Sequence, residues 1–122
     1  MAVDDIDAED VAGQAGFDMA NLRPERTGLP FVVFVSQRGG ARHDVRVKLA
    51  RAPRVRPAEM ITVAVRPVPR VVRGAVSPRE FALVRRWIAL NAEALVRYWN
   101  GEIEYTEDLL AVLKPLAEQD GA

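Results

Sequence analysis

The chain has 122 residues, of which 49% are hydrophobic and 28% charged, and its formal net charge is zero. This length favours one domain with a real core and is too short for a two-domain enzyme. The absence of cysteine excludes disulfides, thiolate nucleophiles and cysteine-based zinc sites. No apolar run approaches the roughly 18–20 residues that span a bilayer, and no signal-like segment stands at the N-terminus. We therefore expect a soluble, cytoplasmic protein that does not enter a membrane.

The zero net charge conceals a strong segregation of charge along the chain. Residues 1–22 carry six acidic and no basic side chains, which gives −6. Residues 23–76 carry twelve basic and three acidic side chains, which gives +9, and residues 77–122 have a charge of −3. The overall charge therefore says nothing about the surface that a partner meets, and the basic middle segment is the most informative functional feature.

Residues 1–27 are acidic, rich in alanine, glycine and aspartate, and without sustained periodicity. This composition predicts a flexible tail ahead of a single domain at 28–116, with residues 117–122 fraying at the far end. A sharper hypothesis is that the tail lies back over the basic segment and competes with a polyanionic partner. The sequence leaves both interpretations open.

A β-hairpin is predicted at the start of the domain. The continuous apolar run at 31–35 is typical of a strand buried on both faces, and Gly39-Gly40 supplies a tight reversal. Residues 43–49 then alternate apolar and charged side chains, which predicts a strand with one buried face.

Two further strands are expected before the helices. Residues 51–58 are basic and interrupted by prolines, so we interpret them as a loop. A third strand follows at 60–66, and residues 70–73 can form only a short edge strand.

The best-defined element is a helix over 77–101. Ser77 is a good N-cap, Glu80 completes a capping box with it, and Asn100-Gly101 is typical of a helix end. Apolar and aromatic side chains recur at steps of three and four, which predicts one buried stripe. The stripe consists of Phe81, Val84, Trp87, Ile88, Asn91, Leu95, Tyr98 and Trp99.

A second, short helix is predicted after the long one, with Thr106 as its N-cap and Pro115 at its end. Strands followed by helices indicate an α+β domain. We expect a small antiparallel sheet of three to four strands, covered on one face by the long C-terminal helix and followed by the short helix.

The basic segment is the predicted binding surface. Its cations can contact a nucleic-acid backbone or an acidic protein partner. No Tyr, Trp or Phe lies between residues 36 and 73, so this segment has no stacking platform for single-stranded bases. The candidate binding residues are Arg38, Arg42, Arg46, Lys48, Arg51, Arg54 and Arg56.

His43 is the only histidine, and its predicted place on a strand, in register with Val45, favours a structural hydrogen-bonding role. The alternative is an RNase-like toxin in which His43 transfers protons while Arg42 and Arg46 stabilise the phosphate. No motif for a hydrolase, metalloprotease, nucleotide or dinucleotide site is present. We expect no metal and no cofactor, and enzymatic activity is the less favoured interpretation.

Two stretches resemble a known family. The run RRWIALNAEALVRYWNGEI, with Asn91, Leu95 and Trp99 spaced by four, and the hairpin GGARHDVRVK are similar to a family of small, uncharacterised bacterial proteins, domain of unknown function 4160. This chain differs in its longer acidic N-terminus and in the helix after Gly101. The resemblance implies a small α+β fold and, in some genomes, toxin–antitoxin-like gene pairs, and it implies no catalytic residue.

The sequence thus favours a non-enzymatic interaction module that binds a protein or a nucleic acid through its arginine-rich hairpin and loop. A third possibility is a structural homo-oligomer, because apolar residues widen the stripe of the long helix beyond one ordinary core face. These residues are Leu83, Leu90 and Val96.

Overall fold

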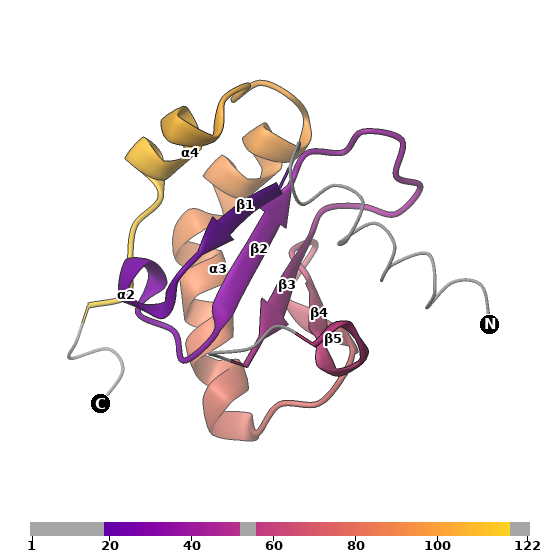
Figure 1. Cartoon of the computed structure of the whole chain (residues 1–122), viewed down its shortest axis with the longest axis vertical. Helices are drawn as coiled ribbons and strands as arrows, with labels where there is room; N and C mark the ends of the chain where they lie inside the picture. Colours follow the sequence, from indigo (N-terminus) through magenta and orange to yellow (C-terminus); the bar gives the residue numbers. More distant parts are fainter. Residues whose placement is uncertain (1–18, 52–55, 118–122) are drawn as a thin grey trace.

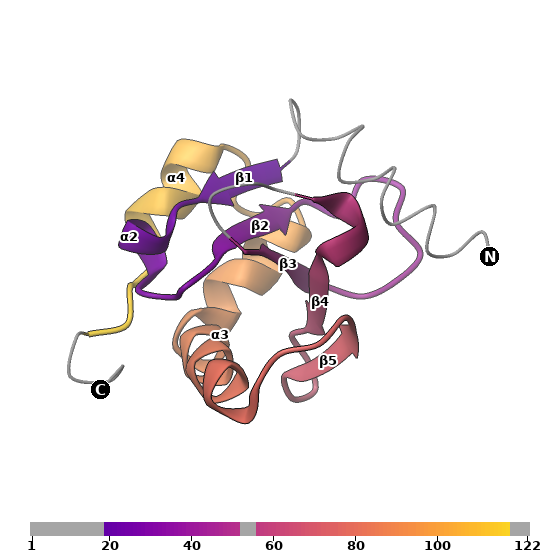
Figure 2. The same cartoon turned by 60° about the horizontal axis from the view of Figure 1, so that its bottom comes forward.

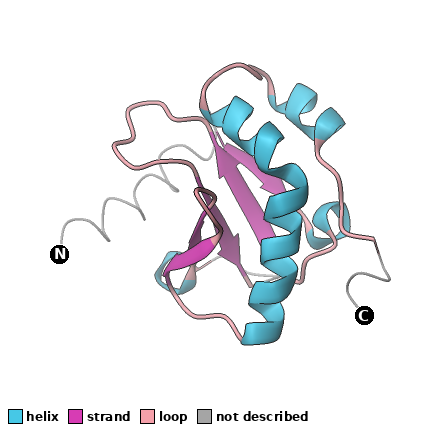
Figure 3. Ribbon diagram, turned by 180° about the vertical axis from the view of Figure 1, so that it is seen from behind, coloured by secondary structure: helices cyan, strands magenta, loops and turns pink. Residues whose placement is uncertain are grey.

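The computed structural model describes residues 19–51 and 56–117 (Figure 1). It is an antiparallel meander of five strands, in the order β1-β2-β3-β4-β5, with the long helix α3 lying across one face (Figure 3). This arrangement confirms the α+β class, the long covering helix and the short helix after it, whereas the sheet has five strands and not three or four. The elements are β1 (Met19–Leu22), α2 (Pro24–Thr27), β2 (Val32–Ser36), β3 (Arg46–Ala50), the 3-10 turn η1 (Pro57–Glu59), β4 (Ile61–Ala64), β5 (Arg70–Arg73), α3 (Pro78–Trp99) and α4 (Thr106–Val112).

The additional strand, β1, lies within the segment that the sequence assigned to the tail. It pairs antiparallel with β2, with Ala20 opposite Val35 and Leu22 opposite Val33. The side chains of Ala20 and Leu22 are each 1% exposed. Four residues are too few for a periodic signal, so pairing with β2 and burial, not propensity, make this strand. The domain therefore begins ahead of residue 28, and residues 1–18 and 118–122 of the predicted tails lie outside the described residues.

The long helix begins and ends as its sequence predicts. The Ser77 hydroxyl accepts a hydrogen bond from the Glu80 amide at 3.0 Å, and the Ser77 amide donates to the Glu80 carboxylate at 2.9 Å. At the other end Gly101 has a φ of 82°, and its amide donates to the Tyr98 carbonyl. The next amide, that of Glu102, donates to the Arg97 carbonyl at 2.9 Å. This pair of bonds is a Schellman motif, which requires a left-handed residue at Gly101.

The main core lies between the sheet and α3. Alternate side chains of the central strands, such as Val33, Val47 and Val63, are fully buried there against Trp87 and the other stripe residues. A second, smaller cluster on the opposite face consists of Met19, Phe34, Ala50 and Met60. The prediction that the strand at 31–35 is buried on both faces is therefore confirmed.

Two local predictions are wrong. His43 is not on a strand, because β3 begins only at Arg46 and the hairpin connection is a longer loop. Thr106 is not the N-cap of α4, since Tyr105 occupies that position. The Thr106 hydroxyl instead lies 3.2 Å from the hydroxyl of Tyr98 on α3. Both side chains contact α3, His43 through the ring of Trp99 and Thr106 through Tyr98.

Candidate anion-binding face

The register of β3, β4 and β5 places basic side chains in two rows across the sheet. Arg46 lies opposite Ala64, which lies opposite Arg70. Lys48 lies opposite Thr62, which lies opposite Arg73. We call the four cations, Arg46, Lys48, Arg70 and Arg73, the basic face.

The basic face is on the side of the sheet that faces away from α3. Val47 and Leu49 are buried in the core beneath α3, so Arg46 and Lys48, which alternate with them, project to the other side. Thr62, which lies between Lys48 and Arg73, is only 2% exposed. Neighbouring strands are about 4.8 Å apart, so cations on β3 and β5 are separated by about 10 Å at the backbone. The result is a compact patch of positive charge around a floor of small residues.

Arg70 and Arg73 were not among the predicted binding residues. On a regular strand two residues three apart point to opposite faces, so their spacing alone does not place Arg70 and Arg73 on one face. The pairing of β4 with β5 contains an irregularity, in which Thr62 is opposite Arg73 and its neighbour Val63 is opposite Val71. The extra residue, Val72, returns Arg73 to the face of Arg70. No signal in the sequence alone reveals this shift.

The loop between β2 and β3 carries two more predicted residues, Arg38 and Arg42, both exposed. Its base is fixed to the end of α3, since the Arg38 amide donates to the Trp99 carbonyl at 3.0 Å. The Gln37 side chain also donates to the Glu104 carbonyl at 2.9 Å. These bonds hold the start of the loop in place and leave both guanidinium groups on the surface.

His43 lies in this loop and packs on Trp99, with ring centroids 5.4 Å apart and an angle of 30° between the rings. Its Nδ1 is 2.8 Å from the Asp44 carbonyl oxygen, an acceptor, so Nδ1 carries the proton and Nε2 is the basic nitrogen when the ring is neutral. Trp99 belongs to the core beneath α3, whereas Arg46 projects from the opposite face. The structure therefore does not bring His43 and Arg46 together.

Asp44, next to His43, does not supply a second proton-transfer group. Its carboxylate accepts two hydrogen bonds from Arg66, at 2.7 and 2.9 Å. The Arg66 guanidinium lowers the pKa of Asp44 to about 2. The carboxylate is therefore ionised at neutral pH and already paired, so it can neither donate a proton nor readily accept one.

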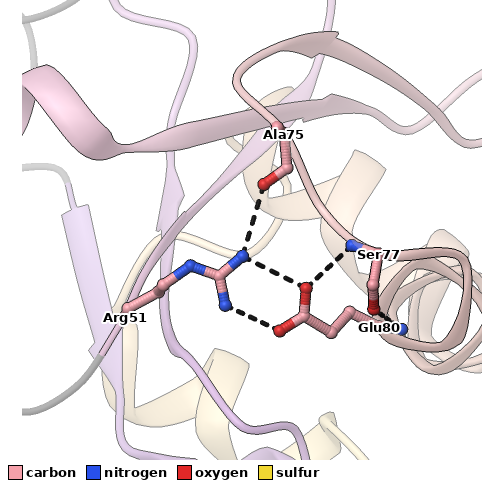
Figure 4. Close-up of polar contacts among 4 residues, drawn as sticks. All are labelled: Arg51, Ala75, Ser77 and Glu80. Carbon is pink, nitrogen blue, oxygen red and sulfur yellow. Dashed lines mark hydrogen bonds and ion pairs between the residues drawn. The ribbon is translucent and has the colours of Figure 1, made fainter.

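Arg51 has a structural role, which Figure 4 shows. Its guanidinium contacts the Glu80 carboxylate through two bonds of 2.6 and 3.1 Å and donates to the Ala75 carbonyl at 3.3 Å. It also lies 5.3 Å from the centre of the Phe31 ring. Arg51 thus joins the end of β3 to the first turn of α3 and is not available for a partner.

The last two predicted residues are Arg56 and Arg54. Arg56 is 3.7 Å from the Glu59 carboxylate, a weak and exposed ion pair. Arg54 lies outside the described residues. The structure thus divides the predicted set, with Arg46 and Lys48 on the basic face, Arg38 and Arg42 in the loop, and Arg51 within the fold.

Among residues 19–51 and 56–117, no group of three histidine or acidic side chains could hold a metal ion. Within the same ranges, no helix has the length and apolar character needed to cross a bilayer. No protein-family model, curated protein or solved structure matches the chain.

Proposed function

We propose that the protein is a non-enzymatic interaction module that binds a polyanionic partner, either an acidic protein segment or a nucleic-acid backbone. The basic face is the feature that supports this proposal, because two strands, β3 and β5, direct four cations to one side of the sheet. Arginine binds carboxylates and phosphates in a bidentate manner, which suits this face to a polyanion.

The 37–45 loop extends the same binding surface in this proposal. Arg38 and Arg42 add two exposed positive charges next to the start of β3, from which Arg46 projects. Phe34, opposite Lys48 in the sheet, and Trp99, whose carbonyl accepts from the Arg38 amide, are 6% and 4% exposed and offer no stacking surface. A bound nucleic acid would therefore be held through its phosphates, without selection of base sequence.

The experiment measures how binding of the full chain depends on salt, with a short RNA, a DNA duplex and an oligo-aspartate as fluorescent probes. Release of counterions makes nucleic-acid binding fall steeply with salt, with a slope near −0.9 for each phosphate contacted. If RNA or DNA is the partner, Arg70→Gln should weaken binding and reduce the slope by about 1. Tighter binding of oligo-aspartate would instead assign an acidic protein segment.

Arg79→Gln is the matched control, because Arg79 is an exposed arginine on α3, outside the basic face. It should leave the affinity and the slope unchanged. Equal losses from Arg70→Gln and Arg79→Gln, or no binding of any probe at low salt, would remove the proposal.

The alternative is an RNase-like toxin in which His43 acts with Arg42 and Arg46. His43 is the one proton-transfer group proposed for it. This alternative predicts RNA cleavage that His43→Ala abolishes. Cleavage that persists in this variant would exclude His43 as the acid or base.

A further inference from the structure

A groove lies along the edge of the sheet, between β1 and α4. Figure 2 shows β1 and β5 at the two edges, with α4 beside β1. The groove has a volume of about 640 Å³, which is within the usual range for ligand sites. We call it the edge groove, and its lining includes Asn21, Arg23, Arg26, Leu110, Leu113 and Pro115.

One wall of the edge groove offers positive charge and the edge strand β1. Arg23 and Arg26 are exposed, and among the described residues neither guanidinium has an ion-pair partner. Glu25 also lines the groove, so these three side chains leave a net charge of +1. Because β1 is an edge strand, the backbone groups on its outer side have no neighbouring strand in the described part of the chain.

The opposite wall is apolar and held in place. Leu110, Leu113 and Pro115 come from α4 and the segment after it. That segment is bound by Asn91, whose side chain accepts from the Lys114 amide at 2.7 Å and donates to the Lys114 carbonyl at 2.9 Å.

A second contact closes the same wall from the side of α2. The Leu116 amide donates to the Thr27 carbonyl at 2.9 Å. Gly28 has a φ of 82°, and a Cβ at this position would be only 2.9 Å from the Leu116 carbonyl oxygen. The groove is thus formed by the fold itself and not by a single surface side chain. Binding of a ligand therefore costs little conformational entropy for ordering its walls.

We propose that the edge groove binds an extended peptide in which acidic and apolar side chains alternate, and that this peptide adds a strand to β1. The backbone of β1 supplies the main-chain hydrogen bonds of strand addition. An acidic side chain of the peptide reaches Arg23 or Arg26, and an apolar one packs against Leu110 and Leu113. A strand edge favours a peptide over a nucleic acid, because only a peptide has the matching donors and acceptors.

The test uses the full chain labelled with 15N and a blocked octapeptide of alternating valine and aspartate as the probe. The amide signals of β1 and of residues 110–113 should shift. The double substitution Arg23→Gln and Arg26→Gln should weaken binding at least tenfold, whereas Arg79→Gln should not. All three positions changed in these variants are exposed, so each variant should keep the wild-type spectrum elsewhere.

A second peptide separates strand addition from charge attraction. The same octapeptide with every second amide N-methylated cannot pair with β1, and its affinity should be at least tenfold lower. Equal affinity of the two peptides, equally large shifts with acetate alone, or shifts confined to β3, β4 and β5 would each overturn the inference. Since none of the groove residues belongs to the basic face, failure here is distinguishable from failure of the proposed function.

Discussion

Asn91 joins two parts of the fold that are far apart in the sequence. It lies on the buried stripe of α3 and is 3% exposed. Its amide nitrogen also donates to the Trp87 carbonyl at 3.0 Å, in addition to its two bonds with Lys114. The helical spacing predicts that Asn91 faces the core, but the spacing cannot predict which backbone groups it satisfies there.

Replacing Asn91 with leucine should lower the free energy of unfolding by about 2–4 kcal/mol, because the Lys114 amide and carbonyl lose their partner in a partly buried place. Urea denaturation measures this change. Glu93→Gln, at an exposed position on the same helix, is the control and should change stability by less than about 0.5 kcal/mol. A similarly small loss in Asn91→Leu would show that the C-terminal segment is held by other contacts.

Glu80 links stability to pH. Hydrogen bonds from Arg51, and then from the Ser77 amide, lower the pKa of Glu80 from 4.5 to about 2. A carboxyl group whose pKa is lower in the folded state stabilises the fold above the unfolded pKa, and this contribution is lost as the pH falls through the folded value. Part of the stability should therefore disappear between pH 4.5 and pH 2.

Glu80→Gln should remove about 1 kcal/mol at pH 7, because the Arg51 side chain is half exposed and water screens the ion pair. The difference from the wild type should shrink as the pH falls from 4.5 to 2, which denaturation at a series of pH values measures. A difference that stays constant over this range would contradict the assigned role of the charge. Asp44→Asn provides a comparison, since Asp44 has a similarly low pKa but lies outside the α3 cap.

Among the elements, α3 was predictable almost completely and β1 not at all. Every signal for α3 is local, from the capping box at Ser77 to Gly101 at the end. Such signals act between residues close in the sequence and do not depend on the rest of the fold. The strand β1 exists only because β2 lies beside it. The same distinction applies to the site, where Arg46 and Lys48 are visible from alternation on one strand but Arg70 and Arg73 depend on an irregular pairing between two.

The exposure of the apolar residues on α3 argues against the predicted homo-oligomer. Leu83 and Val96 are partly buried and pack against the core, which leaves Leu90, at 45% exposed, as the one of the three on the surface. A single leucine is ordinary on a protein surface and does not form an interface. Light scattering should therefore give the mass of one chain, 13.5 kDa. A dimer mass that Leu90→Lys converts to the mass of one chain would instead support self-association through α3.

At the scale of the whole molecule, positive and negative charge are separated along one chain of zero net charge. Residues 1–18 contain all six acidic side chains of the N-terminal segment and no basic one, so their removal changes the net charge from 0 to +6. The hypothesis that this segment competes for the basic surface stays a prediction, because these residues lie outside the described part of the chain.

If the segment competes, deletion of residues 1–18 should increase the affinity for RNA or oligo-aspartate at least tenfold at low salt, and fluorescence anisotropy measures this increase. The gain should become small near 1 M salt, where the Debye length is only about 3 Å. As a control, the six acidic residues can be replaced by their amides in the full chain, which should reproduce the gain. An unchanged affinity at low salt would exclude competition by the tail.

The sequence by itself determined the α+β class, the long helix with both of its ends, the hairpin ahead of it and the concentration of basic residues in the middle of the chain. Each of these depends on residues that are close together in the chain, whose periodicity and capping act locally. The tertiary structure alone decided that β1 joins the sheet, that Arg51 belongs to the fold and that Arg70 and Arg73 complete the basic face. Those outcomes depend on pairing and burial between segments that are distant in sequence. The spacing of residues along the chain does not predict such contacts.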